Sequence, residues 1–231
     1  MAGAVSRSVL ADQIRDHLLE GILSGRFPPH SRIVETQVAR ELGTSQAPVR
    51  EALRALEGIG VVQISPFRGA RVRRPSPEEL LGAYSVRAAL EVLGARQAVP
   101  RLTDADLAEL VGFGEAMDAA ARTGDGRGVA EADAAFHGRI VELAANPTLL
   151  GIWQSLAPFS RTYMSVVGPG ADPAWSAQLH VPIIAALRTR DVEAVVRALE
   201  THFVEARENM AGRLAAAEYA ADGTVTAQGN A

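Results

Sequence analysis

The fold of the N-terminal part of the chain is decided by residues 44–73, TSQAPVREALRALEGIGVVQISPFRGARVR. This segment has the pattern of a short helix followed by a hairpin. The first half has apolar residues at helical spacing, and Ser45 is placed to cap the helix. Pro48 falls in the first turn, where a missing N–H costs no helical hydrogen bond. In the second half, two β-prone runs flank a turn at residues 67–69, which predicts a β-hairpin with this turn at its tip.

Two further helical patterns precede this segment. A first amphipathic helix is marked by apolar residues about one turn apart, at Leu10, Ile14, Leu18 and Ile22. After the break FPPHSRI, a second short helix ends at Gly43 and has its apolar residues at Ile33, Val38, Ala39 and Leu42. Three helices and a hairpin form the winged helix-turn-helix pattern, which we assign to residues 8–74.

Charge is distributed unequally along the chain. Residues 1–74 contain 11 Arg against 7 Asp and Glu, whereas residues 75–231 contain 12 Arg against 20 acidic residues. A basic first third on an acidic remainder indicates that only the first third contacts an anionic polymer. We therefore expect double-stranded DNA as the partner of this part.

Composition excludes several classes of protein. No stretch approaches eighteen uninterrupted apolar residues, so we expect no membrane-spanning helix. The N-terminal sequence MAGAVSRSVLADQ lacks the basic and apolar regions of a signal peptide, and we expect a cytoplasmic protein. The chain has no cysteine, which excludes disulfides, thiolate metal sites and a cysteine nucleophile.

The remainder of the chain is predicted to be helical. RRPSPEE (residues 73–79) is typical of a linker that becomes a helix N-terminus, with Ser76 as the cap. Helical patterns then follow with short breaks, at 77–99, 103–123, 127–145, 147–165, 174–189 and 191–217. We therefore expect a mainly α protein with an all-helical bundle at residues 75–217. The small, polar tail at 218–231 is expected to be disordered.

The helix that follows residue 44 has the polar residues that a DNA-reading helix needs. Such a helix presents forked donors near its N-terminus to the major groove and packs its apolar face on the domain. The candidate DNA contacts are Thr44, Ser45, Gln46 and Arg50 on the helix, and Arg68 and Gly69 at the hairpin tip. Further arginines up to residue 74 add positive charge. The alternative is that these arginines form a solvated surface of a small helical domain.

Three of the five histidines lie on or beside apolar helical faces. His137, His180 and His202 each have apolar residues three or four positions away, on three different helical segments. Asp133 lies one turn before His137 on the same side. A single histidine on such a face is usually a core residue with a hydrogen bond. Three histidines with an inward carboxylate indicate a divalent cation, because an unpaired buried carboxylate is costly and these groups are typical ligands.

Residues 32–72 resemble the winged-helix domain of the GntR family of bacterial transcription regulators. The resemblance is carried by Glu41-Leu42-Gly43, PVREAL (residues 48–53), Leu56-Glu57 and Gly69. The helical remainder resembles the ligand-binding domain of the FadR-like branch (FCD type), so the resemblance covers about residues 8–215. It implies that Arg50, Arg68 and Gly69 contact DNA.

One departure from the family pattern concerns DNA specificity. Gln46 and Ala47 stand where the family usually has arginine and threonine. Glutamine prefers adenine edges, whereas arginine prefers guanine edges. The operator is therefore expected to differ from the family's usual site, with Gln46 as a specificity position.

The same resemblance implies a metal site and an effector site. A metal-binding subset of the FadR-like branch carries an Asp-x-x-x-His pair and two later histidines, which match Asp133, His137, His180 and His202. Leu179 stands where the family often has a glutamate before the third ligand. Zinc is the first choice for this ligand set, and nickel, manganese and iron also fit.

Arg87 is the candidate anchor for an effector. SVRAALE (residues 85–91) resembles the segment of the family that lines the ligand cavity with an arginine. A small carboxylate could then bind both this arginine and an open position on the metal. The alternative for Arg87 is an i,i+4 ion pair with Glu91, which stabilises a helix only weakly.

The sequence therefore predicts a metabolite-responsive transcription regulator rather than an enzyme. We expect a homodimer, held together by the helical domain, that binds a palindromic operator and senses its effector at the metal. Two alternatives remain open. One is a metal-dependent, hydrolase-like enzyme in which the metal activates water. The other is a DNA-binding regulator whose metal is purely structural.

Overall fold

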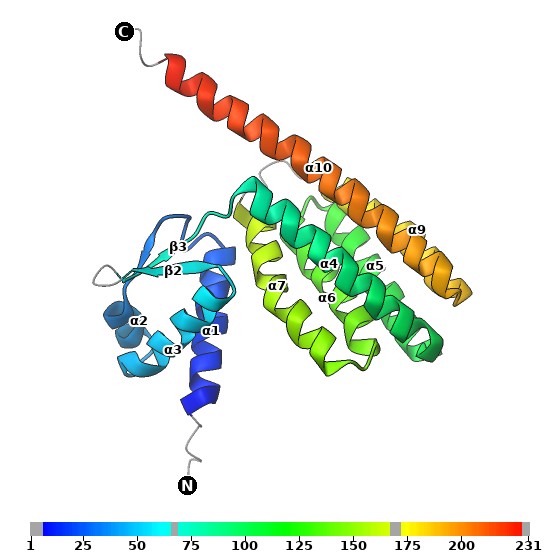
Figure 1. Cartoon of the computed structure of the whole chain (residues 1–231), viewed down its shortest axis with the longest axis horizontal. Helices are drawn as coiled ribbons and strands as arrows, with labels where there is room; N and C mark the ends of the chain where they lie inside the picture. Colours follow the sequence, from blue (N-terminus) through cyan, green and yellow to red (C-terminus); the bar gives the residue numbers. More distant parts are fainter. Residues whose placement is uncertain (1–6, 66–68, 167–171, 228–231) are drawn as a thin grey trace. The chain divides into compact units, whose positions relative to one another are not determined.

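Figure 1 shows the computed structural model, which describes residues 7–65, 69–166 and 172–227. Side chains are described for residues 9–65, 69–156 and 172–216. The chain divides into two compact units, one formed by residues 1–75 and 155–169 and the other by 76–154 and 170–231. Each unit has its own hydrophobic core.

The first unit combines helices with a small antiparallel sheet (Figure 1). Its elements up to residue 75 are α1 (Arg7–Leu23), β1 (Arg32–Ile33), α2 (Glu35–Glu41), α3 (Gln46–Gly58), β2 (Val62–Ser65) and β3 (Gly69–Val72). The sheet order is β1-β3-β2, with Val62 opposite Val72 and Ser65 opposite Gly69. The predicted winged helix-turn-helix fold is confirmed. Strand β1 was not predicted, because its two residues pair only with the distant β3.

Helices α1 and α3 pack through the apolar faces expected from the sequence. Ile14, Leu18 and Ile22 of α1 share one core with Val49, Leu53 and Leu56 of α3. All of these side chains are 2% exposed or less. The opposite face of α3 therefore remains available to a partner.

Ser45 occupies the N-cap position of α3, but its side chain makes no capping hydrogen bond. The expected cap is therefore present in backbone geometry only, with φ −81° and ψ 164°. A cap hydroxyl accepts from the N–H of the second or third helical residue. The third residue here is Pro48, which has no N–H, so one of the two usual donors is missing.

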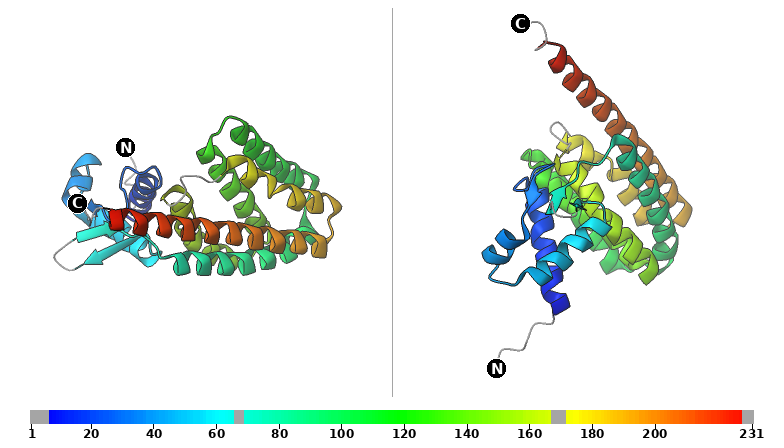
Figure 2. Two further views of the ribbon diagram at one scale, coloured as in Figure 1. Left: turned by 90° about the horizontal axis from the view of Figure 1, so that it is seen from above. Right: turned by 60° about the vertical axis from the view of Figure 1, so that its left-hand side comes forward.

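The rest of the chain is helical (Figures 1 and 2). The elements are α4 (Pro77–Ala98), the 3-10 turn η1 (Val99–Arg101), α5 (Asp104–Arg122), α6 (Gly126–Leu143), α7 (Pro147–Val166), α8 (Pro173–Gln178), α9 (Val181–Thr189) and α10 (Val192–Ala227). The start of α4 follows the prediction. Ser76 Oγ accepts from the Glu79 N–H at 3.1 Å, and Glu79 Oε2 accepts from the Ser76 N–H at 2.8 Å. This reciprocal capping box explains why α4 begins where it does.

The single helix predicted at 174–189 is wrong, because the structure divides it into α8 and α9. Pro182 lies in the first turn of α9, where a proline is tolerated. In a continuous helix the same proline would lack an N–H for its hydrogen bond and would clash with the preceding turn. The break leaves His180 at the N-cap position of α9.

Helix α10 ends later than the sequence analysis predicted. It continues to Ala227 instead of ending at residue 217. The segment LAAAEYAA (214–221) explains the difference, because alanine, leucine and glutamate are strong helix formers. Residues 228–231 lie outside the described residues, and so do the side chains from 217 onward.

No helix among the described residues is long and apolar enough to cross a membrane. The apolar side chains instead pack inside the two units. In the second unit, α4 and α10 run side by side in both views of Figure 2. The core there includes Phe136, Ile140, Ile183, Leu187 and Leu199, each 1% exposed or less.

Candidate metal centre and candidate DNA interface

Four residues from distant parts of the sequence meet inside the second unit. Asp133 and His137 lie on α6, His180 immediately precedes α9, and His202 lies on α10. The imidazoles of His137, His180 and His202 are 0%, 2% and 6% exposed, and Asp133 is half-buried. One candidate ligand atom from each residue lies within 4.8 Å of the other three. The structure therefore brings together all four residues that the sequence singled out.

The spacing of these atoms suits a single cation. Asp133 Oδ1 lies 3.1 Å from His180 Nε2 and 3.7 Å from His137 Nε2. The two Nε2 atoms are 3.2 Å apart. Atoms that bind one zinc ion at about 2.1 Å are separated by roughly 3.0 to 3.4 Å. The residues present therefore fit a divalent metal without large movement.

Nε2 of each histidine faces the cluster, and Nδ1 serves as a hydrogen-bond donor to a neighbouring group. His180 Nδ1 donates to the Ser176 carbonyl oxygen at 3.0 Å, and His202 Nδ1 donates to the Leu179 carbonyl oxygen at 3.4 Å. A carbonyl oxygen only accepts, so both Nδ1 atoms carry the proton. The Nε2 lone pairs are then free for a metal, which is the usual arrangement around metal-binding histidines.

His137 is held by a side chain instead of a carbonyl. Its Nδ1 contacts Glu91 Oε2, and Glu91 is fully buried on α4. From the sequence, Glu91 is expected only as the i,i+4 partner of Arg87. Its closeness to His137 could not be read from one helical face, because the two residues lie on different helices.

Arg87 is buried beside the same cluster. Its Nε donates to Glu91 Oε1 at 2.6 Å, and its Nη2 lies 3.9 Å from Asp133 Oδ2. The guanidinium also lies over the rings of Tyr84, Trp153 and Phe203, between 5.6 and 6.0 Å from their centroids. The i,i+4 pair with Glu91 is thus present, but it is a buried pair next to the candidate metal ligands rather than a surface pair.

The ionisation of the cluster favours a bound cation. Burial opposes the charge of Glu91, but Arg87 and His137 lower its pKa to about 2. Burial opposes the charge of Asp133 as well, and His137, His180 and Arg87 hold its pKa well below the usual range. Burial and the neighbouring histidines lower the pKa of His202 well below its ordinary value. Ionised carboxylates beside a neutral imidazole are the states that a metal requires.

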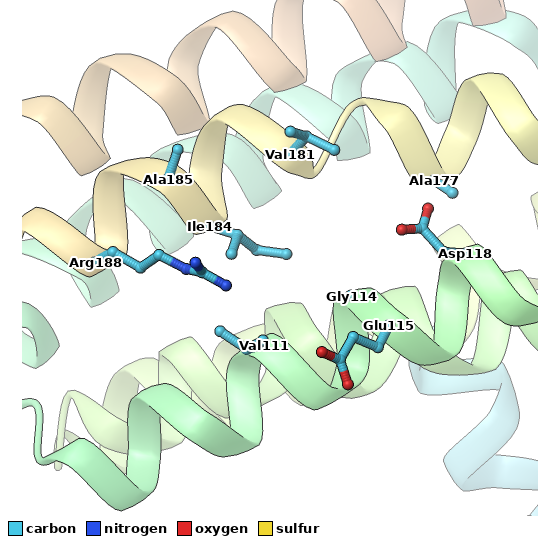
Figure 3. A pocket seen from close by; sticks show the side chains of 9 residues that line it. All are labelled: Val111, Gly114, Glu115, Asp118, Ala177, Val181, Ile184, Ala185 and Arg188. Carbon is cyan, nitrogen blue, oxygen red and sulfur yellow. The ribbon is translucent and has the colours of Figure 1, made fainter.

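Two hollows lie near these helices. One, of about 240 Å³, is lined by Trp175, Leu179 and His202 among others, so it opens onto a candidate metal ligand. The other, of about 310 Å³, lies between α5 and α9 (Figure 3). Its lining has an apolar part around Ile184 and includes Arg188, but no residue of the metal cluster. Of these two hollows, only the first is lined by a candidate metal ligand.

The candidate DNA contacts lie at the N-terminal end of α3 and at the wing. Ser45, Gln46 and Arg50 are exposed, whereas Thr44 is half-buried. Gly69 begins β3 with φ +78°, a conformation that glycine adopts without strain. Arg68 lies outside the described residues.

Arg50 is paired with an acidic residue of α2. Its Nη2 donates to Glu35 Oε2 at 2.9 Å and its Nε donates to the same oxygen at 3.2 Å. The hydrogen bond and charge of Glu35 raise the pKa of Arg50. No sequence pattern predicts this pair, since Glu35 and Arg50 are 15 positions apart and on different helices.

The chain matches two protein families over most of its length. Residues 10–72 match the family described as bacterial regulatory proteins, gntR family. Residues 82–205 match the FCD domain. The first match extends from residue 10, within α1, to the end of β3, and the second contains all four candidate metal ligands together with Arg87 and Glu91.

A curated relative gives the same assignment, and two solved structures share the fold. The chain is 35% identical over 202 residues to the probable D-xylose utilization operon transcriptional repressor of Paenarthrobacter nicotinovorans, covering 87% of this chain and 88% of that protein. The fold is similar to that of McbR/YncC from E. coli, with a TM-score of 0.77 and 24% identity over 87% of this chain and 96% of the other. A putative GntR regulator from Rhodococcus sp. RHA1 has a TM-score of 0.75 at 24% identity, with 87% and 97% covered. The chain belongs to the gntR family of bacterial regulatory proteins, in the FadR-like branch with an FCD domain, and is a DNA-binding transcription regulator rather than an enzyme.

Proposed function

We propose that the chain is a metabolite-responsive regulator in which a divalent metal at Asp133, His137, His180 and His202 forms part of the effector site. The observation that carries this proposal is the common orientation of the histidines. At His180 and His202 the Nδ1 atom is used by a backbone carbonyl, which leaves Nε2 for the cluster. A close cluster of imidazole lone pairs and an ionised carboxylate is unfavourable without a cation between them.

Zinc is the metal that we propose first. Three imidazoles and one carboxylate fit zinc, and nickel, manganese and iron are the other candidates. A metal held by these four residues would supply positive charge that attracts an anionic ligand. The protein supplies the orientation of the four ligands and excludes water from most of the site.

The charges around the site favour a carboxylate effector. Arg87, Glu91 and Asp133 together carry one net negative charge, so a divalent cation changes the sum to one net positive charge. One carboxylate on the ligand would then neutralise the buried site. Arg87 is proposed as the second anchor, because it lies next to Asp133 and keeps its charge when buried.

At the other end of the chain we propose that α3 reads DNA. Thr44, Ser45, Gln46 and Arg50 would face the major groove, and the hairpin tip with Arg68 and Gly69 would contact the neighbouring phosphates or minor groove. Two copies, joined through the region of residues 75–217, would bind a palindromic operator. An effector would regulate binding if it favoured one arrangement of the two reading heads, and DNA would then alter effector affinity reciprocally.

The first test concerns the metal. Protein purified without added metal should contain close to one equivalent of a divalent metal by mass spectrometry, and His180→Ala should abolish this content. Addition of a chelator followed by circular dichroism then separates two roles. Loss of fold would indicate a purely structural metal, whereas an intact fold with altered DNA affinity would indicate a regulatory one.

The second test concerns DNA. A duplex selected from a random library by the wild-type protein should be retarded, and the affinity should fall steeply as salt rises. Arg50→Ala should weaken this binding by about 1–3 kcal/mol and reduce the salt dependence by about one counterion. Retardation that is insensitive to Arg50→Ala would contradict the assignment of α3 as the reading helix.

A further inference from the structure

Glu91 is the most enclosed charged side chain among the described residues, with 0% exposure. Its carboxylate contacts three other helical residues. Oε1 accepts from Arg87 Nε at 2.6 Å and from Trp153 Nε1 at 2.8 Å, and Oε2 contacts His137 Nδ1. Glu91 therefore connects α4, α6 and α7 at one point inside the second unit.

The chemistry of these partners fixes the direction of every hydrogen bond. A guanidinium and an indole N–H can only donate, so Oε1 is already occupied by two donors. An ionised carboxylate only accepts, and the Arg87 guanidinium that donates to Oε1 favours the ionised form of Glu91. His137 must therefore carry its proton on Nδ1, which leaves the Nε2 lone pair directed to Asp133 and His180.

His137 differs in this respect from the other two histidines. The orientations of His180 and His202 depend on carbonyl oxygens of Ser176 and Leu179. Among the described contacts, only His137 depends on a side chain for its Nδ1 partner. A substitution can therefore release one imidazole and leave the other two in place.

We infer that Glu91 is a positioning residue of the metal centre, which sets the tautomer and orientation of His137 and holds Arg87 at the edge of the site. This inference rests on the proposed metal site. A carboxylate behind a metal-binding imidazole also makes the imidazole a stronger ligand, because it stabilises positive charge on the ring. The affinity of the site for metal is thus controlled from α4, which supplies none of the four ligands.

Glu91→Gln tests the inference with a side chain of the same shape. An amide has one accepting and one donating end, whereas all three partners of Glu91 donate. Either His137 faces an N–H₂ group and loses its Nδ1 proton, or Arg87 and Trp153 face that group. We expect this variant to bind Co²⁺ about 10 to 100-fold more weakly than the wild type. The visible spectrum of the Co²⁺-saturated protein should also change, because it reports the ligand geometry.

A double variant separates positioning from simple charge compensation. Arg87→Met with Glu91→Leu removes both charges, and replacing a buried ion pair by apolar residues often preserves the fold. If Glu91 only neutralised Arg87, the double variant would bind Co²⁺ as the wild type does. We expect it to stay at least about 10-fold weaker, since His137 still lacks its acceptor.

Trp153→Phe is the matched control. It removes one donor from Glu91 Oε1 and leaves the contact with His137 in place, so Co²⁺ affinity should remain within about threefold of the wild-type value. All variants are compared as chelated protein by circular dichroism, to confirm that they are folded. Wild-type affinity and spectrum in either Glu91 variant would overturn this inference alone. A wild-type protein that bound no Co²⁺ would overturn the proposed metal site and this inference with it.

Discussion

At the scale of single residues, the two candidate sites each depend on an acidic side chain that the sequence does not reveal. Glu91 holds His137 in the metal cluster, and Glu35 holds Arg50 on the reading helix. Both pairs join residues on different helices. Helical periodicity describes one helix at a time, so it identifies His137 and Arg50 but not their partners.

Glu35→Gln should change how the protein discriminates among DNA sequences. The Arg50–Glu35 pair is partly exposed, so it contributes little to stability. Removing the carboxylate would free the guanidinium and take a negative charge away from the DNA. We expect tighter binding to a scrambled duplex and a preference for the selected duplex that is lower by about fivefold. Fluorescence anisotropy with both duplexes measures this ratio.

Glu41→Gln provides the control for this experiment. Glu41 lies on the same helix as Glu35 but pairs with Arg26 instead of Arg50. Both changes remove one negative charge from α2. An equal loss of preference in the two variants would show that net charge, rather than the orientation of Arg50, determines the discrimination.

At the scale of helices, close packing between α5 and α9 depends on Gly114. A Cβ at this position would lie 2.3 Å from Ile184 Cδ1, which is too near for van der Waals contact. Figure 3 labels both residues on the two facing helices. Glycine is otherwise unfavourable in a helix by about 1 kcal/mol relative to alanine. The residue is therefore explained by the approach of α9 rather than by helix propensity.

A double-mutant cycle tests this explanation. Gly114→Ala in the wild-type protein gains helix propensity but forces Ile184 to move, at a cost of about 1–3 kcal/mol. In an Ile184→Val background the clashing atom is absent, and Gly114→Ala should stabilise the protein by about 1 kcal/mol. Urea unfolding of the four proteins gives the coupling free energy. A coupling close to zero would contradict the packing explanation.

Some of the secondary-structure elements could be predicted from the sequence, and others could not. The hairpin, the helical bundle and the cap at Ser76 follow from local patterns, and the structure contains them. The division between α8 and α9 was missed, because the helical pattern of Ile183, Ile184 and Leu187 was extended back to residue 174 across Pro182, which acts only on the backbone. The cluster of Asp133, His137, His180 and His202 was found because each histidine lies on an apolar stripe.

At the scale of the whole molecule, two compact units carry different chemistry. The unit with α3 and the wing comes mainly from the basic first third of the sequence, with residues 155–169 added from the acidic remainder, and the unit with the candidate metal ligands comes from that remainder. The core of each unit is formed by its own residues. Under the proposed function, a change at the candidate metal ligands would therefore affect DNA binding without altering the fold of α3.

Removal of the proposed metal by a chelator should affect the stability of the second unit and leave that of the first unchanged. Removing the proposed metal would leave Asp133 and the three imidazoles of the second unit without a cation between them, while the core around Leu18, Leu53 and Leu56 should be unchanged. We expect the second unit to unfold with a lower thermal midpoint and the first unit to unfold with an unchanged midpoint. Differential scanning calorimetry with and without EDTA measures both. A uniform shift of a single transition would mean that the two units unfold together.

The break between α8 and α9 constrains how this regulator can change over time. The carbonyl oxygens that accept from His180 and His202 belong to the backbone, so no point substitution at Ser176 or Leu179 deletes them. The acceptor for His137 is a glutamate side chain, which a single codon change can replace. Under the proposed function, variation among descendants of this gene should therefore adjust the affinity of the proposed metal site mainly at residue 91 and leave the other two imidazoles as inherited. A regulator can in this way acquire a weaker or stronger site in one mutational step.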